Sequence, residues 1–128
     1  MDRPPPLGRS TPRLINPMSQ TETAINLGNV GEIIAKRQLY YFDDAHQRRT
    51  VSVIVGKPHL SPSSQEYECP FQLIGIGSER PQIATGRDSM QALQSALILV
   101  GALLNHLNDQ LGRKLIWEGA IQGELGFP

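Results

Sequence analysis

The sequence predicts an α+β domain: an antiparallel sheet of three to four strands, one long helix packed on it, and a short final strand. Apolar residues recur at helical spacing between Asp88 and Leu111, whereas residues 50–56 alternate with a period of two. Turn-forming residues separate the apolar segments that precede the helix. With 128 residues, of which 39% are hydrophobic, the chain can bury one core without disulfides or metal.

The domain is expected over residues 31–128, preceded by a disordered, proline-rich tail over residues 1–30. Apolar residues at regular spacing are sparse in the tail, so burial cannot offset the entropy of ordering it. Its prolines include Pro4, Pro5, Pro6, Pro12 and Pro17. Met18 is an alternative natural start to Met1, because a polar leader begins there. N-terminal sequencing of the native protein distinguishes the two.

Two strands are expected to form a hairpin at the start of the domain, over residues 33–42 and 50–56, with a turn at residues 43–47. In the second strand, Val51, Val53 and Val55 should all face the same side of the sheet. The first places Ala35, Leu39 and Tyr41 on one side and Lys36, Gln38 and Tyr40 on the other. Arg37 breaks this alternation.

The remaining strands are shorter. Residues 59–65 are expected to form an exposed loop, followed by a third strand over residues 67–73. Pro70 lacks a backbone donor and therefore predicts an edge position or a bulge in that strand. Residues 82–85 can form a fourth strand, and residues 115–117 a short final one.

The long helix has a continuous apolar stripe, which consists of Leu93, Leu97, Val100, Leu104, Leu107 and Leu111. Asp88 is expected to cap its first turn, with Gln91 reaching back, and Gly112 to end it in a left-handed conformation. The stripe should face the valine side of the sheet. The other side of the helix carries a face suited to a partner, formed by Ile98, Gly101, Ala102 and Asn105. Either the tails of the chain or another subunit should cover it.

Composition excludes several classes. Twelve basic residues balance twelve acidic ones, which argues against a nucleic-acid binder. Cys69 is the only cysteine, so neither an intramolecular disulfide nor a cysteine-based zinc site can form, and a reducing cytoplasm is expected. The longest apolar run, residues 96–104, is too short to cross a membrane. No cofactor is expected.

The nearest approach to a catalytic or metal cluster is Asp43, Asp44 and His46, whose carboxylates and imidazole could converge in the hairpin turn. The competing interpretation is a solvated turn, where Asp is common. His59 and His106 have neither a nucleophile nor an orienting acid nearby in sequence, and Cys69 falls on the apolar side of a strand. These three residues are therefore expected to be structural.

A set of short motifs spread along the domain supports a comparison with a known family. It comprises Cys69-Pro70-Phe71, Gly75, Asp88-Ser89, the helix start Gln91-Ala92-Leu93, Ala96-Leu97, Leu115, Trp117 with Gly119, and the ending Leu125-Gly126-Phe127-Pro128. Over about residues 33–128 the chain resembles an uncharacterised family of small bacterial domains, a domain of unknown function. The resemblance implies a bacterial origin and a compact α+β domain, and it supplies no catalytic residues.

A more distant resemblance lies in Gly86-Arg87-Asp88-Ser89, Ala92-Leu93 and Ala96, which are similar to HicB-type antitoxins. The partial ribonuclease-H-like domain of those antitoxins has three strands, a helix and a further strand, and it binds a small toxin without catalysis. This chain departs from them because it lacks an appended DNA-binding helical segment and the acidic and proline pattern before the helix.

These observations favour a non-enzymatic protein-binding module of the bacterial cytoplasm, an antitoxin-like or immunity-like neutraliser. It would present a sheet edge or the Ile98, Gly101, Ala102 and Asn105 face to a protein partner or to a second copy in a homodimer. The alternative is a small metal-dependent hydrolase that uses Asp43, Asp44 and His46. A structural subunit of a larger assembly is a second alternative. Stoichiometric metal in the purified protein would favour the hydrolase.

Overall fold

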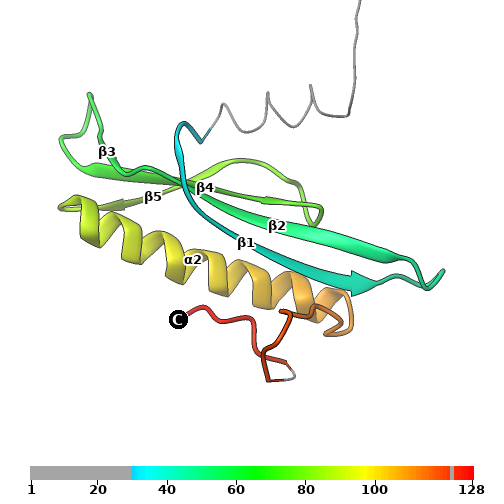
Figure 1. Cartoon of the computed structure of the whole chain (residues 1–128). Coiled ribbons are helices and arrows are strands. Elements are labelled where there is room, and N and C mark those ends of the chain that lie inside the picture. Colours follow the sequence, from blue (N-terminus) through cyan, green and yellow to red (C-terminus); the bar gives the residue numbers. More distant parts are fainter. Residues whose placement is uncertain (1–29, 122) are drawn as a thin grey trace, which may run out of the picture.

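The computed structural model describes residues 30–121 and 123–128. Within them the elements are β1 (Ile33–Phe42), β2 (Arg48–Gly56), β3 (His59–Leu60), β4 (Tyr67–Ile74), β5 (Gln82–Gly86) and α2 (Ser89–Gln110). Figure 1 shows α2 along one face of the sheet, with the last residues turning back beside the helix. The predicted α+β class is confirmed. The predicted tail and the choice between Met1 and Met18 concern residues outside the described part, apart from Val30, which is buried.

The described strands form one antiparallel sheet, in which β1 pairs with β2, β2 and β3 pair with different parts of one side of β4, and β5 pairs with the other side of β4. The hairpin of β1 and β2 lies where it is predicted, although β2 begins two residues earlier, at Arg48. The predicted loop over residues 59–65 starts with a two-residue strand, because His59 and Leu60 pair with β4. The fourth predicted strand is confirmed as β5.

For Pro70 the sequence predicts an edge position or a bulge; β4 is an interior strand, but neither β2 nor β3 pairs with Pro70 itself. β4 pairs with β5 on one side and with both β2 and β3 on the other. β2 pairs with residues 71–74 and β3 with residues 67–68, which leaves Pro70 at the point where the neighbouring strand changes. A residue without a backbone donor fits this interruption of the ladder.

The predicted final strand over residues 115–117 is reduced to a single bridge. Ile116 exchanges two backbone hydrogen bonds with Tyr40, at 3.0 and 2.8 Å. This bridge holds the segment that follows α2 against the outer edge of β1. The end of the chain is thereby tied to the first strand of the domain.

One side of the sheet forms the core together with α2, as predicted. Val51, Val53 and Val55 are buried in a cluster whose other sheet members are Leu39, Cys69, Phe71, Leu73 and Ala84. Burial of each large apolar side chain stabilises the fold by about 1.5–3 kcal/mol. The alternation of β2 therefore identified the inner side of the sheet correctly.

The helix covers only part of this inner side. An α-helix with its side chains is about 10–12 Å wide, whereas neighbouring strands are about 4.8 Å apart, so one helix covers roughly two strands. α2 packs on β4 and β5. The inner side of β1 and β2 is completed by residues from the segment after the helix, because Leu115 and Leu125 belong to the same buried cluster.

The leucine stripe is offset from the side of α2 that is most deeply buried. The fully buried helix positions are four residues apart, at Ala92, Ala96, Val100 and Leu104. The prediction is correct for Val100 and Leu104, whereas the other stripe residues are half-buried at the flanks. The helix lies so close to β5 that a Cβ atom on Gly86 would overlap the backbone of Ala92. Alanine permits this approach because it has no side chain beyond Cβ.

Both predicted helix ends are confirmed. The Asp88 carboxylate accepts a hydrogen bond from the Gln91 amide at 2.8 Å, and the Gln91 side chain accepts one from the Arg87 amide at 2.6 Å. Gly112 has a φ of +82°, in the left-handed region. By length and composition α2 could also span a membrane, a test that core helices pass as well. Its Ala92–Leu104 side packs in the core of this domain.

Asn108 is a buried polar residue whose side chain bonds to the chain that follows α2. Its Oδ1 accepts a hydrogen bond from the buried Leu115 amide at 2.9 Å. Asn108→Ala should lower the free energy of unfolding, measured by urea denaturation, by about 1–3 kcal/mol, because that amide loses its acceptor. The exposed Asn105→Ala is the control and should change it by less than about 0.5 kcal/mol. Equal effects of the two substitutions would contradict the assignment.

Candidate protein-interaction groove

A groove of about 690 Å³ lies beyond the C-terminal end of α2. The end of β1, the segment after the helix and the returning chain enclose it, and its lining includes Phe42, Asn108, Ile116, Trp117, Ile121 and Glu124. No sequence pattern placed these residues together. They come from three parts of the chain that only the fold brings into contact.

Local backbone geometry builds the floor of the groove. Arg113, at a φ of +63°, turns the chain, and its amide donates to the Asn108 carbonyl at 2.7 Å. The Asn108 side chain then binds the Leu115 amide, and Ile116 pairs with Tyr40 on β1. A further turn follows, in which the Ala120 amide donates to the Trp117 carbonyl at 3.0 Å. These bonds direct the chain around the groove.

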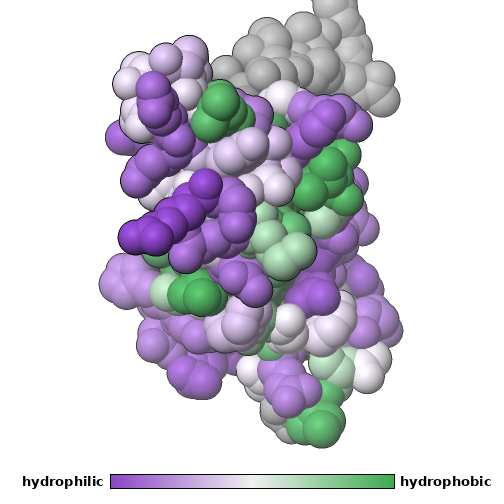
Figure 2. Space-filling model, turned by 90° about the vertical axis from the view of Figure 1, so that its left-hand side faces the viewer, coloured by the Kyte–Doolittle hydropathy of each residue, from purple (hydrophilic) through white to green (hydrophobic). Residues whose placement is uncertain are grey.

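The groove has an apolar lining that is open to solvent. Three large apolar side chains there are exposed: Phe42 by 48%, Ile116 by 40% and Ile121 by 75%. At the opposite end of the molecule, around β3 and the start of α2, Leu60 and Met90 are also exposed. Figure 2 shows that end, where hydrophobic residues lie in separate places among hydrophilic ones. The groove is distinguished because its apolar residues line one concavity.

Two cations also line the groove. The Lys114 ammonium lies 3.1 Å from the Asp44 carboxylate, and Arg113 pairs with Asp109 one helical turn earlier. All four side chains are at least 45% exposed, and such surface ion pairs contribute only about 0–1 kcal/mol. Both cations can therefore exchange these carboxylates for others at little cost.

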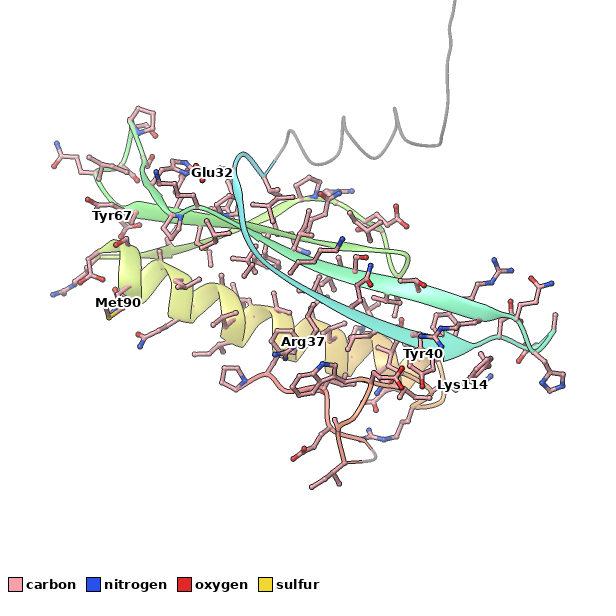
Figure 3. The ribbon with its side chains drawn as sticks, viewed as in Figure 1. Glu32, Arg37, Tyr40, Tyr67, Met90 and Lys114 are labelled. Atoms are coloured by element: carbon pink, nitrogen blue, oxygen red, sulfur yellow. The ribbon has the colours of Figure 1, made fainter. Side chains whose placement is uncertain are left out.

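Arg37 connects the returning chain to β1. Its guanidinium carbon lies 3.9 Å from the centroid of the Trp117 ring and 4.6 Å from that of Phe127. Its Nη1 donates to the carbonyl oxygens of Leu125 at 3.0 Å and Gly126 at 2.9 Å. Figure 3 shows Arg37 directed from β1 toward the end of the chain. Arg37, which breaks the predicted alternation of β1, thus faces inward, and its guanidinium is hydrogen-bonded to the C-terminal tail.

The predicted partner face on α2 is only partly accessible. Ile98 is 54% exposed, and Ala102 and Asn105 are exposed as well. Gly101 is buried because the C-terminal tail packs closely against it. A Cβ atom at this position would lie 3.0 Å from both Phe127 Cβ and the Pro128 carbonyl oxygen. Of the two covers expected for this side of the helix, the C-terminal tail is the one that lies over Gly101.

In the hairpin turn, the two carboxylates of the alternative metal site, Asp43 and Asp44, make other contacts. One oxygen of Asp43 accepts hydrogen bonds from the amides of Ala45 and Gln47, both at 2.9 Å, and the other binds Arg49 Nε at 2.7 Å. The Asp44 side chain is fully exposed and pairs with Lys114. In residues 30–121 and 123–128, no three His, Cys, Asp or Glu side chains are grouped to hold a metal ion. The geometry matches a turn stabilised by its own aspartate.

The remaining candidate residues lie apart from one another. His59 Nε2 is 3.3 Å from a Glu68 oxygen at the β3–β4 pair, and His106 Nε2 is 3.4 Å from Nε2 of the Gln110 side chain on α2. Cys69 is buried, with its Sγ 3.5 Å from the Gly56 carbonyl oxygen, and burial raises the pKa of its thiol. A buried thiol with a raised pKa is a poor nucleophile.

The aspartate turn predicts a pH effect. Hydrogen bonds from the Gln47 amide and then the Arg49 side chain lower the pKa of the Asp43 carboxyl from its ordinary 3.8. Its stabilising contribution is therefore present above the unfolded-state pKa and is lost as pH falls through the folded-state pKa. A carbon-detected NMR titration should place the Asp43 midpoint below 3.8, and Arg49→Gln should raise it.

A magnesium or zinc titration provides the counter-test in the same spectra. We expect the NMR signals of Asp43, Asp44 and His46 not to move with one equivalent of either ion. Both oxygens of Asp43 already accept hydrogen bonds within the turn. Saturable movement of all three signals at one equivalent would support the metal-dependent hydrolase instead.

Comparison with known proteins identifies the family and no relative of known activity. No curated protein and no solved structure matches the chain. A family model described as a domain of unknown function matches residues 35–128, which include β1 to α2 except the first two residues of β1, together with the groove and the C-terminal tail. The chain therefore belongs to the DUF6968 family.

Proposed function

We propose that this domain is a non-enzymatic protein-binding module and that its groove holds a segment of the partner. The observation that carries the proposal is the gathering of exposed Phe42, Ile116 and Ile121 around one groove of about 690 Å³. Exposed large apolar residues scattered singly need no explanation, whereas those that gather around a concavity are typical of binding sites.

The lining indicates what kind of segment would bind. A bulky apolar side chain in the groove would cover part of this exposed apolar surface, and each residue fully removed from water would contribute up to about 1.5–3 kcal/mol. Arg113 and Lys114 would favour a carboxylate beside this anchor, because their present carboxylate partners are exposed and weakly held. The proposed occupant is therefore an extended segment of a protein with an apolar anchor next to an acidic residue.

The distribution of ionisable groups supports binding over chemistry. Catalytic sites bring together groups with mutually tuned pKa values. In the described residues the Asp43 carboxylate stabilises a turn, Cys69 is buried without a base, and His59 and His106 belong to separate elements. A toxin or effector neutraliser, as the distant resemblance to HicB-type antitoxins implies, is a narrower form of the same proposal.

Two charge substitutions separate the groove from the helix face. Ile121→Glu introduces charge into the groove, and Ile98→Glu introduces the same charge on the exposed side of α2. Both side chains are more than half exposed, so both variants should fold normally, as circular dichroism would check. In affinity purification from the native host with mass spectrometry, Ile121→Glu should lose the stoichiometric partner that wild type and Ile98→Glu retain.

Three results would contradict the proposal. A partner lost with Ile98→Glu and retained with Ile121→Glu would transfer binding to the helix face. Recovery of a second copy of this chain alone would make the groove a homodimer contact. Recovery of no partner, together with stoichiometric metal in the purified protein, would favour the hydrolase.

A further inference from the structure

We propose that residues 125–128 form a strap that opens and closes as a unit, and that Arg37 is the clamp that holds it closed. The strap runs across the side of α2 that contains Gly101 and reaches β1. It directly follows the groove residues Ile121 and Glu124, so its closed position would hold that wall of the groove in place.

The clamp concentrates the contacts of the strap on one side chain. Arg37 binds two successive strap carbonyls and lies against the Phe127 ring, while its contact with Trp117 joins the strap to the segment after α2. Hydrogen bonds from a guanidinium are stronger than neutral ones, and aromatic faces attract the same cation. Loss of the cation would therefore weaken every one of these contacts at once.

Gly126 makes the clamp specific. Its φ is +82°, and a Cβ atom on it would overlap the Trp117 ring. Only glycine combines this backbone conformation with so close an approach. The strap can close in this manner only where Gly126 lies against the single tryptophan of the chain, which makes Trp117 a natural probe of closure.

The structure limits what opening can disturb. Most of the strap lies at the surface: Gly126 and Pro128 are exposed and Phe127 is half-buried, whereas Leu125 is 7% exposed. The sheet ladders and the contact of α2 with β4 and β5 do not involve the strap. Opening would therefore withdraw Leu125 and Phe127 and uncover Gly101 and part of the inner side of β1 and β2, while the strands that α2 covers, β4 and β5, keep their packing.

The test is made on the free, full-length protein with Arg37→Leu, which keeps bulk and removes the cation. Losing two charge-assisted hydrogen bonds should shift the opening equilibrium about a hundredfold toward the open form. Trp117 should become more accessible to acrylamide quenching, and the Gly126 NMR signals should move to random-coil positions. The Phe71 and Ala84 signals should stay at their wild-type positions, since both residues lie on the strands that α2 covers.

Arg48→Leu is the matched control. Arg48 also stacks on an aromatic ring, with its guanidinium carbon 3.8 Å from the Tyr40 centroid, but its ion pair is with exposed Glu118 at 3.8 Å rather than with the strap. The Gly126 NMR signals of the Arg48→Leu variant should match those of the wild type. Gly126→Ala is a second route to opening that leaves the charge intact, and it should reproduce the Trp117 change of Arg37→Leu.

Each outcome decides a separate point. Wild-type Gly126 signals in Arg37→Leu would overturn the clamp, and loss of the Phe71 and Ala84 signals together with those of Gly126 would overturn the independent strap. The control that the strap exerts on the groove rests on the proposed function: Arg37→Leu should also reduce partner recovery. If the strap opens and partner recovery is unchanged, the proposed influence of the strap on the groove is overturned. If Ile121→Glu also has no effect on recovery, the proposed function fails and the strap stands.

Discussion

The width of a single helix relative to the sheet is the constraint on which the rest of this structure depends. A helix of about 10–12 Å covers roughly two strands, and α2 covers β4 and β5. The inner sides of β1 and β2 carry Leu39, Val51 and Val53 and need another cover. The chain after α2 supplies it, through Leu115 and Leu125 in the core. The C-terminal tail is thus a structural layer of the domain.

The groove follows from the way this cover is attached. The segment after α2 is fixed at the Ile116 bridge to Tyr40, and it is fixed again where Arg37 binds the Leu125 and Gly126 carbonyls. Between these two attachments the chain must leave the surface and return, and the groove lies beneath that excursion. A site formed in this way depends on both attachments, so residues outside the groove can determine its shape.

Local rules predicted the regular elements because those elements depend on neighbours in sequence. Alternation located β1 and β2, and capping by Asp88 and Gly112 located both ends of α2. The buried side of α2 was not predictable from hydrophobicity, since the Leu93 and Leu97 side chains are the more apolar ones. Close approach selects Ala92 and Ala96 instead, and the glycine that permits it, Gly86, lies on another element. The interior position of β4 was missed at Pro70 for a related reason, because the change of neighbour from β2 to β3 has no local signal.

The groove and the clamp were not predictable because their residues are far apart in sequence. Arg37 and Leu125 are separated by 88 residues, and only the return of the chain brings them together. Two signals were nevertheless visible: Arg37 interrupted a strand pattern, and Trp117, Gly126 and Phe127 belonged to the family-like pattern. The structure places all four in one cluster. The partner face expected at Ile98, Gly101, Ala102 and Asn105 includes a glycine that the tail covers, and no local pattern indicates that cover.

The most direct measurement is a set of methyl NOEs in the unmodified protein in solution. If the tail covers the half of the sheet that α2 leaves open, the Leu125 methyl groups should show NOEs to core residues of β1 and β2, and the Phe127 ring should show them to Val53, Val55 and Leu97, with which it lines a small cavity. Random-coil shifts for Leu125 and Phe127, with NOEs from α2 to Leu39 and Val51 in their place, would show that the helix alone covers the sheet and would contradict the structural role of the tail.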